Sequence, residues 1–186
     1  MDRICVYCGS SDSAGDVYQQ AVKTFAEACL ERDIGLVYGG SSTGTMGTLA
    51  DTMLAGDGDV VGVIPESILE RETPHQSLTQ LERTETKSER KERMAELADG
   101  FVALPGGLGT QEELFTIVGQ AKHGQHGKPC GYLNVAGYYD SMVQFLAHAV
   151  EEGFISPVQR QLILVADTPS DLLDSLDAYD SPIQNG

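Results

Sequence analysis

The sequence is poor in basic residues. Its 186 residues include 12 lysines and arginines against 28 aspartates and glutamates, which gives a formal net charge of −16 at pH 7. Only five residues are lysine. Because nucleic-acid binding depends on a basic surface that neutralises phosphates, we expect no nucleic-acid partner.

Long apolar runs are also missing. No stretch approaches the roughly 20 apolar residues of a membrane-spanning helix, so we expect no membrane partner. Met1-Asp2-Arg3 leads directly into an apolar segment, without the pattern of a signal peptide. The pair Cys5-x-x-Cys8 falls in a strand-like run rather than at a helix start, where redox cysteines have a lowered pKa. We therefore expect buried structural thiols and a cytoplasmic protein.

The apolar segments alternate between strand-like and helix-like patterns. Strands are expected at about 3–8, 35–38, 59–64, 81–84, 101–104, 129–135 and 162–166, with Pro65 ending the third. Helices are expected at about 17–32, from the end of the glycine-rich turn 39–47 to about 55, and at about 86–97, 114–122 and 138–152. Thr86-x-x-Glu89 is a capping box that opens the helix at 86–97, and Thr168 with Pro169 forms a start signal for a last helix from 169. The strands are apolar throughout, which is typical of a parallel sheet covered on both faces. This pattern predicts a Rossmann-like, doubly wound α/β fold, with 1–186 as a single domain and about 180–186 as a frayed tail.

Ligands of such folds bind beyond the carboxyl ends of the strands. Those ends are Gly9-Ser10, Gly39-Gly40, the loop after Pro65, and Pro105-Gly106-Gly107. Two of the four are glycine-rich turns that precede helices, so they are candidate phosphate sites.

The stretch from Pro105 to Glu113 combines such a turn with two acids. Backbone N–H groups at a helix start attract anions, and Gly106, Gly107 and Gly109 allow a phosphate to approach closely. We expect Glu112 and Glu113 in the first helical turn, beside that phosphate. A second interpretation stays open, because Thr110-x-x-Glu113 is also a capping box in which Glu113 only closes its own helix end.

Familiar nucleotide motifs fit poorly. A P-loop would need lysine where Thr45 stands after Gly39 and Gly44. A dinucleotide fingerprint would need further glycines after Gly9, or a glycine in place of Glu112 after Gly107-x-Gly109. The histidines are scattered along the chain and are expected to be solvated, so no metal site is expected (His75, His123, His126 and His148).

Positive charge gathers in one short segment, which contains Arg83, Lys87, Arg90, Lys91 and Arg93. Such a cluster indicates either a local anionic ligand or a solvated helix face paired with neighbouring glutamates. With a phosphate cradle and two acids nearby, cleavage of an N-glycosidic bond fits the first interpretation. A carboxylate stabilises the oxocarbenium-like transition state, while the phosphate of a nucleoside 5′-monophosphate anchors the substrate.

Several motifs together resemble the Lonely Guy (LOG) family, whose members are cytokinin riboside 5′-monophosphate phosphoribohydrolases and are often labelled lysine decarboxylases. The segment 105–113 matches the family signature P-G-G-x-G-T-x-x-E. Further matches at family-like spacing are 8–11, 39–47, Arg90-Lys91 with Met94, and 133–139. Lys87-Ser88 and Gly119 depart from the family pattern, which commonly has Met-His and Thr there.

The resemblance implies hydrolysis of AMP or an N6-modified AMP to the free base and ribose 5-phosphate, without a cofactor, by a homodimer whose active site lies near the interface. It implies Arg90 and Glu113 as the catalytic pair. It also implies substrate contacts by Glu72, Lys91, Gly106, Gly107, Gly109, Thr110 and Glu112, while the strand-end turns add Gly9, Ser10, Gly39 and Gly40. Two alternatives remain: a non-catalytic nucleotide sensor or a protein resembling molybdenum-cofactor carriers, and, with the poorest fit to the glycine pattern, an NAD-dependent enzyme.

Overall fold

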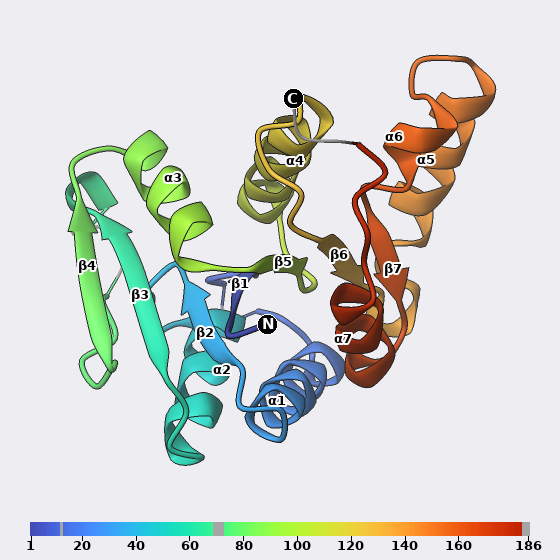
Figure 1. Ribbon diagram of the computed structural model, residues 1–186. Coiled ribbons are helices and arrows are strands. Elements are labelled where there is room, and N and C mark those ends of the chain that lie inside the picture. The colour runs from blue at the N-terminus through green and yellow to red at the C-terminus, as the bar shows by residue number, and fades with distance from the viewer. Residues whose placement is uncertain (12, 69–72, 184–186) are drawn as a thin grey trace.

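A seven-stranded parallel sheet forms the centre of the molecule in the computed structural model, which describes residues 1–11, 13–68 and 73–183 (Figure 1). The strand order is β4-β3-β2-β1-β5-β6-β7. The strands are β1 Arg3–Tyr7, β2 Gly35–Tyr38, β3 Val60–Pro65, β4 Gln80–Thr84, β5 Gly100–Ala103, β6 Cys130–Leu133 and β7 Leu164–Ala166. This arrangement confirms the doubly wound α/β prediction.

Helices cover both faces of the sheet (Figure 1). They are α1 Asp16–Leu30, α2 Gly44–Ala55, α3 Lys87–Leu97, α4 Leu108–Lys122, α5 Asp140–Glu151, α6 Pro157–Arg160 and α7 Pro169–Asp177, with short 3₁₀ turns at Glu66–Ile68 and Val135–Gly137. Residues of α1, α2 and α7 share one hydrophobic cluster, and residues of α3, α4 and α5 share the other. Ile4 and Val6 of β1 face the first cluster, while Cys5 and Tyr7 face the second. Both faces are buried, which is why the strand sequences are apolar throughout.

The order of the strands reverses between β1 and β5. From β1 the chain winds outward through β2, β3 and β4, and it then returns to place β5 on the other side of β1. Helices on the two sides of this switch point diverge, which leaves a crevice beyond the carboxyl ends of β1 and β5. Gly9-Ser10 follows β1, and Pro105-Gly106-Gly107 follows β5, so the fold brings these two predicted turns together.

The ends of three elements can be compared with what the sequence predicted. Pro65 does not end β3 early but is its last residue, in register with Thr84 of β4. Helix α6 was not expected, although Ser156 and Gln159 form a complete capping box there. Thr168 caps α7 as predicted, because its side chain accepts from the Asp171 N–H.

The start of α3 is a capping box in only one direction. Thr86 accepts from the Glu89 N–H, as predicted. The Glu89 carboxylate, however, accepts from the backbone N–H of Glu85 rather than from that of Thr86.

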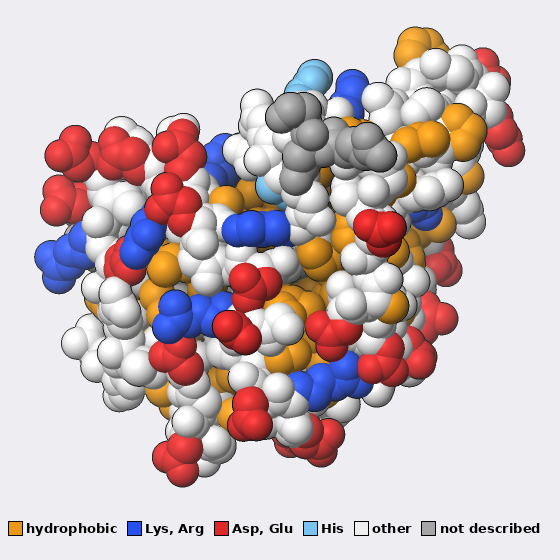
Figure 2. All heavy atoms as spheres, viewed as in Figure 1, with side chains coloured by type: hydrophobic (Ala, Val, Ile, Leu, Met, Phe, Trp, Pro, Cys, Tyr) orange, Lys and Arg blue, Asp and Glu red, His pale blue; other side chains and the backbone are white. Residues whose placement is uncertain are grey.

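No helix in the described part of the chain combines the length and the apolar character that crossing a membrane requires. Acidic side chains are spread over the face shown in Figure 2, with a few basic ones among them.

Candidate active site

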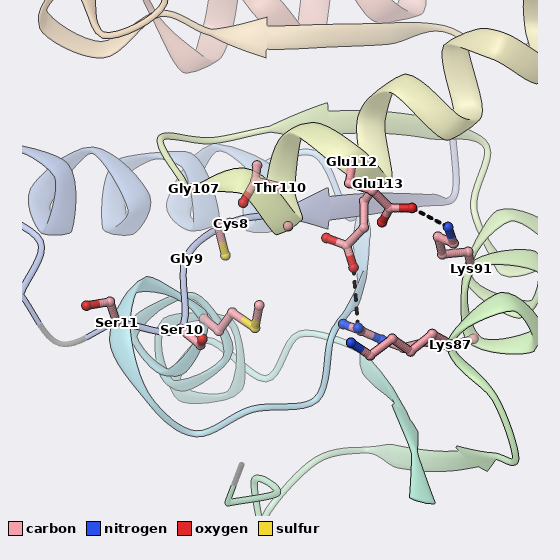
Figure 3. Close-up of a pocket in the computed structure, with 13 residues that line it drawn as sticks. Cys8, Gly9, Ser10, Ser11, Lys87, Lys91, Gly107, Thr110, Glu112 and Glu113 are labelled. Carbon is pink, nitrogen blue, oxygen red and sulfur yellow. Dashed lines mark hydrogen bonds and ion pairs between the residues drawn. The ribbon is translucent and has the colours of Figure 1, made fainter. Parts of the chain in front are cut away.

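A cavity of about 350 Å³ opens at the switch point (Figure 3). It is lined by the turn after β1, by the first two turns of α3 and of α4, and by one residue of α2. These residues are Cys8, Gly9, Ser10, Ser11, Met46, Lys87, Arg90, Lys91, Gly107, Gly109, Thr110, Glu112 and Glu113. Most of the predicted site residues are therefore on its wall. Gly106, Gly39 and Gly40 lie outside this lining, and Glu72 lies outside the described residues.

Helix α4 begins earlier than the sequence indicated. Its N-cap is Gly107 and its first residue is Leu108, so Thr110 is inside the helix and buried. Glu112 and Glu113 consequently lie in the second turn, and the expectation that they occupy the first turn is wrong. The capping-box interpretation of Glu113 is also wrong, because Thr110 is not at the helix end.

The N-terminus of α4 has the shape of an anion cradle. A Cβ placed on Gly107 or Gly109 would meet no heavy atom within 4 Å, so neither glycine is required by packing against the protein. Gly106 differs, since its Cβ would lie 2.2 Å from the Oγ1 atom of Thr110. The open space above Gly107 and Gly109 adjoins the free N–H groups of the first helical turn, which fits a bound phosphate.

Arg90 and Glu113 form an ion pair in the cavity wall. The Arg90 Nη1 atom lies 3.4 Å from the Glu113 Oε1 atom, and their side chains are 12% and 10% exposed. The Arg90 Nε–H group also donates to the Val63 carbonyl at 3.0 Å, which fixes the guanidinium at the end of β3. A charge pair so poorly solvated is costly to maintain unless both partners stay in place.

Gly39 and Gly40 act beneath the site. A Cβ on Gly39 would lie 2.3 Å from the Arg90 Nη2 atom, so this glycine makes room for the guanidinium. Gly40 has a φ of +80°, and its carbonyl accepts from the His75 N–H at 2.9 Å. The structure therefore places both glycines in the support of the site, away from the cavity surface.

Thr45, which replaces the lysine of a P-loop, ties the second glycine turn to the first. Its hydroxyl donates to the Gly9 carbonyl at 2.9 Å and lies 3.1 Å from the Gly9 nitrogen, whose N–H it accepts. The Met46 N–H donates to the same carbonyl at 3.2 Å. The turn from Gly39 to Gly47 thus holds Gly9 and Ser10 at the cavity.

Some residues of the basic cluster lie at the cavity, as expected for an anionic ligand, and another pairs with glutamates elsewhere. Lys91 lies 2.5 Å from Glu112 across the cavity rim, and Arg90 faces Glu113. Arg93 instead pairs with Glu82 of β4 and with Glu96 of its own helix, away from the cavity lining. Its hydrogen bonds to Glu82 lower the pKa of that carboxyl.

Four residues on the cavity were not predicted as site residues: Cys8, Ser11, Met46 and Lys87. Burial raises the pKa of Cys8 to about 12, so its thiol is neutral and unsuited to act as a nucleophile. Burial also raises the pKa of Cys5, which agrees with the expectation of structural thiols. Ser11 continues the Gly9-Ser10 turn and Lys87 belongs to the basic cluster, so both could have been proposed from the sequence.

Two tyrosines support the cradle from behind. The Tyr139 hydroxyl donates to the Leu104 carbonyl at 2.7 Å, and the Tyr138 hydroxyl donates to the Gly106 carbonyl at 2.8 Å. Ala136, with a φ of +49°, forms the sharp turn that precedes them. These bonds fix the carbonyl groups on both sides of Pro105.

Among the described residues, no group of three or more histidine, cysteine, aspartate or glutamate side chains could hold a metal ion. Not all histidines are solvated, contrary to expectation. His75 is buried and bonds to Asp51 at 3.0 Å, and His126 is half-buried and bonds to the Ile117 carbonyl at 3.0 Å. Their partners are structural.

Comparison with known proteins gives consistent results. Residues 46–176 match the family model described as "Possible lysine decarboxylase". The chain is 45% identical over 180 residues to the probable cytokinin riboside 5′-monophosphate phosphoribohydrolase LOGL5 of Oryza sativa subsp. japonica, covering 97% of this chain and 73% of the relative. It is 43% identical over 178 residues to the cytokinin riboside 5′-monophosphate phosphoribohydrolase LOG7 of Arabidopsis thaliana, covering 96% and 82%.

Among solved structures, the molybdenum cofactor carrier protein of Chlamydomonas reinhardtii has a TM-score of 0.70, with 19% identity and coverage of 96% of this chain and 99% of that one. This likeness concerns the fold alone. The sequence relatives, in contrast, are similar over nearly the whole chain, including the segments that build the cavity. The chain therefore belongs to the LOG family of cytokinin riboside 5′-monophosphate phosphoribohydrolases.

Proposed function

We propose that this protein hydrolyses the N-glycosidic bond of a nucleoside 5′-monophosphate, AMP or an N6-modified AMP, to the free base and ribose 5-phosphate. The observation that carries the proposal is the poorly solvated Arg90–Glu113 pair beside the open N-terminus of α4. The relatives named above act on nucleotides of this class, as their names state.

In the proposed reaction, the 5′-phosphate binds at Gly107 and Gly109, where the helix N-terminus supplies N–H donors and partial positive charge. The sugar then extends toward Glu113. As the bond between C1′ and the base nitrogen breaks, its electron pair leaves with the base, and positive charge develops on the sugar. The carboxylate of Glu113 stabilises that charge, and the oxygen of a water molecule forms the new bond to C1′. One proton of the water goes to the departing base nitrogen, directly or through solvent, and the other remains in the new C1′ hydroxyl group.

Arg90 serves this step by holding the carboxylate. Its guanidinium is fixed by the Val63 carbonyl and fits only because Gly39 has no side chain. The ion pair limits the rotation of the Glu113 side chain, so its carboxylate is oriented before the substrate arrives.

Base release measured by chromatography tests the proposal. The wild-type protein should convert AMP or isopentenyl-AMP to the free base. The substitutions Glu113→Gln and Arg90→Ala should lower kcat by about 10²- to 10⁴-fold, the usual contribution of a positioned acid–base or charged group. Glu27→Gln, an exposed change of the same kind on α1, is the matched control and should leave kcat unchanged. Absence of any released base from the wild-type protein would refute the proposal.

A nucleotide or cofactor carrier is the second candidate, favoured by the fold likeness to the molybdenum cofactor carrier protein. A carrier would bind a nucleotide saturably and release it unchanged. Two carboxylates beside a phosphate site favour the hydrolase, because they weaken anion binding and are useful when positive charge develops on the substrate.

We also propose a homodimer. Leu108 and Phe154 are 90% and 86% exposed, and an apolar groove of about 210 Å³ between α4, α5 and α6 has Phe115 and Phe154 on its wall. Figure 2 shows hydrophobic side chains over α5 and α6 at the upper right. An exposed apolar surface of this kind is typical of a protein interface, and Leu108 extends it to the rim of the active site.

Light scattering tests the dimer. Phe154→Ser should shift the protein toward the monomer, whereas Val17→Ser, which changes an exposed apolar residue on the opposite face of the sheet, should not. A monomeric wild-type protein at micromolar concentration would contradict the proposal.

We further propose one domain for 1–186 and a cytoplasmic location. One sheet carries both hydrophobic clusters, which supports a single domain. All four cysteines are free and buried, which supports a cytoplasmic location, because exported proteins usually pair their cysteines. Limited proteolysis and cell fractionation are the respective tests.

A further inference from the structure

Lys87 differs from the other charged residues of the cavity wall, each of which is in an ion pair. Five Lys, Arg, Asp or Glu side chains are on the wall: Lys87, Arg90, Lys91, Glu112 and Glu113. Arg90 pairs with Glu113 and Lys91 pairs with Glu112. Lys87 has no hydrogen-bond or ion-pair partner among the described residues, and Figure 3 shows its side chain extending into the hollow below Glu113.

The position of Lys87 is unfavourable for the stability of α3. Lys87 is the first residue of that helix, where the macrodipole disfavours positive charge. Arg90 and Lys91 lie three and four residues later, on the same helix face, so Lys87 is also repelled by two like charges. The helix dipole and the two like charges are unfavourable, and no residue in the described part of the chain compensates for them, so helix stability does not explain this lysine.

The net charge of the cavity wall indicates what Lys87 does there. Among the lining residues that the structure describes, three cations and two carboxylates sum to one positive charge, and without Lys87 these residues would be neutral together. The 5′-phosphate of a nucleotide carries about −1.5 to −2 charges at pH 7, and the protein as a whole carries −16. An approaching nucleotide is therefore repelled over most of the surface and attracted only where positive charge is in excess.

We propose that Lys87 is a specificity-determining residue, whose unpaired ammonium group selects phosphorylated over unphosphorylated nucleosides in this cavity. The inference rests on the proposed function and adds to it a contact outside the Arg90–Glu113 and Lys91–Glu112 pairs. Lys87 acts on binding of the anion rather than on bond cleavage, so it affects KM and not kcat.

Steady-state kinetics with AMP at low and high salt provide the test. Lys87→Met keeps an unbranched, flexible side chain and removes the charged group. It should raise KM roughly ten-fold or more, the range of one charge-assisted interaction, with kcat within about two-fold. The increase should shrink as salt is added, because salt screens the charge. Lys87→Arg should restore most of the wild-type KM. Lys23→Met, on the exposed face of α1, makes the same change in net charge and should behave as wild type.

Thermal melting checks the fold of each variant, and Lys87→Met should match or exceed the wild-type melting temperature. Equal KM values for wild type, Lys87→Met and Lys23→Met would overturn the inference, as would a fall in kcat without a change in KM. If the wild-type protein released no base, the proposed function would fail separately. Calorimetric binding of AMP and adenosine would then test the role of Lys87. Replacing Lys87 with methionine should weaken the binding of AMP and leave the binding of adenosine unchanged. A wild-type protein that binds adenosine as tightly as AMP would overturn the inference as well.

Discussion

Adding one methyl group to Gly109 should raise stability and lower activity at the same time. Gly109 is the second residue of α4, and its backbone is not in the left-handed conformation that requires glycine. A Cβ there meets no heavy atom of the protein within 4 Å. The methyl group of Gly109→Ala therefore fits the empty site and occupies the space that we assign to the phosphate.

The two effects have different sizes. Alanine favours the helical state over glycine by about 0.5–1 kcal/mol in a helix interior, and by less in the first turn. For a chain of this length, each 1 kcal/mol raises Tm by about 2–4 °C. In the loaded site, one methyl group against a well-packed phosphate costs about 1–3 kcal/mol, which corresponds to an increase in KM of about 5- to 150-fold.

Differential scanning calorimetry without ligand and base-release kinetics with AMP measure the two effects. Gly119→Ala is the stability control, since it adds the same group to the same helix, also with nothing within 4 Å, outside the active-site cavity. Because Gly119 lines the apolar groove between α4, α5 and α6, both variants are compared at the same protein concentration. A Gly109→Ala protein with wild-type KM would refute the cradle, because the phosphate would then bind elsewhere. A loss of stability would refute the interpretation of Gly109 as free of packing constraints.

Three further predictions concern the support of the site. Gly39→Ala should lower kcat by about 10²-fold while the protein stays folded, because the new Cβ would lie 2.3 Å from the Arg90 Nη2 atom and push the guanidinium away. Kinetics measure the loss of kcat, and circular dichroism checks the fold. Tyr139→Phe should destabilise the protein by about 1–3 kcal/mol, since it removes a 2.7 Å hydrogen bond to the buried Leu104 carbonyl, and urea unfolding measures the loss. Burial lowers the pKa of His126, whose neutral ring donates to one backbone group and accepts from another. The unfolded chain therefore binds more protons, so stability should fall as the pH drops below about 6.5, and His126→Gln should reduce that dependence in urea titrations at several pH values.

The sheet and the mouth of the site were predictable because their signals are local. Apolar runs identify the strands, and parallel strands end at one edge, so the sequence places Gly9-Ser10 and Pro105-Gly107 at the same edge of the sheet. That the two turns are neighbours there follows from the strand order, which the sequence did not predict. Thr168 and Thr86 mark helix starts by side chains that make the expected hydrogen bonds. In each case a residue type has a direct physical effect on the backbone around it.

The start of α4 was less accessible to this reasoning. Gly107 caps the helix without any side-chain hydrogen bond. Thr110 and Glu113 have the spacing of a capping box, but both lie inside the helix rather than at its start. Lys87 was visible in the basic cluster, but that none of the described residues pairs with it depends on where the nearby glutamate side chains point. Such facts follow from tertiary packing, which overrides local preference.

The same packing distinguishes the hydrolase from a carrier better than the fold does. The carrier of Chlamydomonas reinhardtii is similar in fold over 96% of this chain, so the fold by itself is compatible with either function. A binding site for an anion would be improved by removing Glu113, because the carboxylate repels phosphate and consumes the charge of Arg90. A hydrolase needs that carboxylate where positive charge develops on the sugar. Glu113→Gln should therefore tighten AMP binding in calorimetry while it abolishes base release, and a parallel loss of both would indicate that Glu113 serves binding alone.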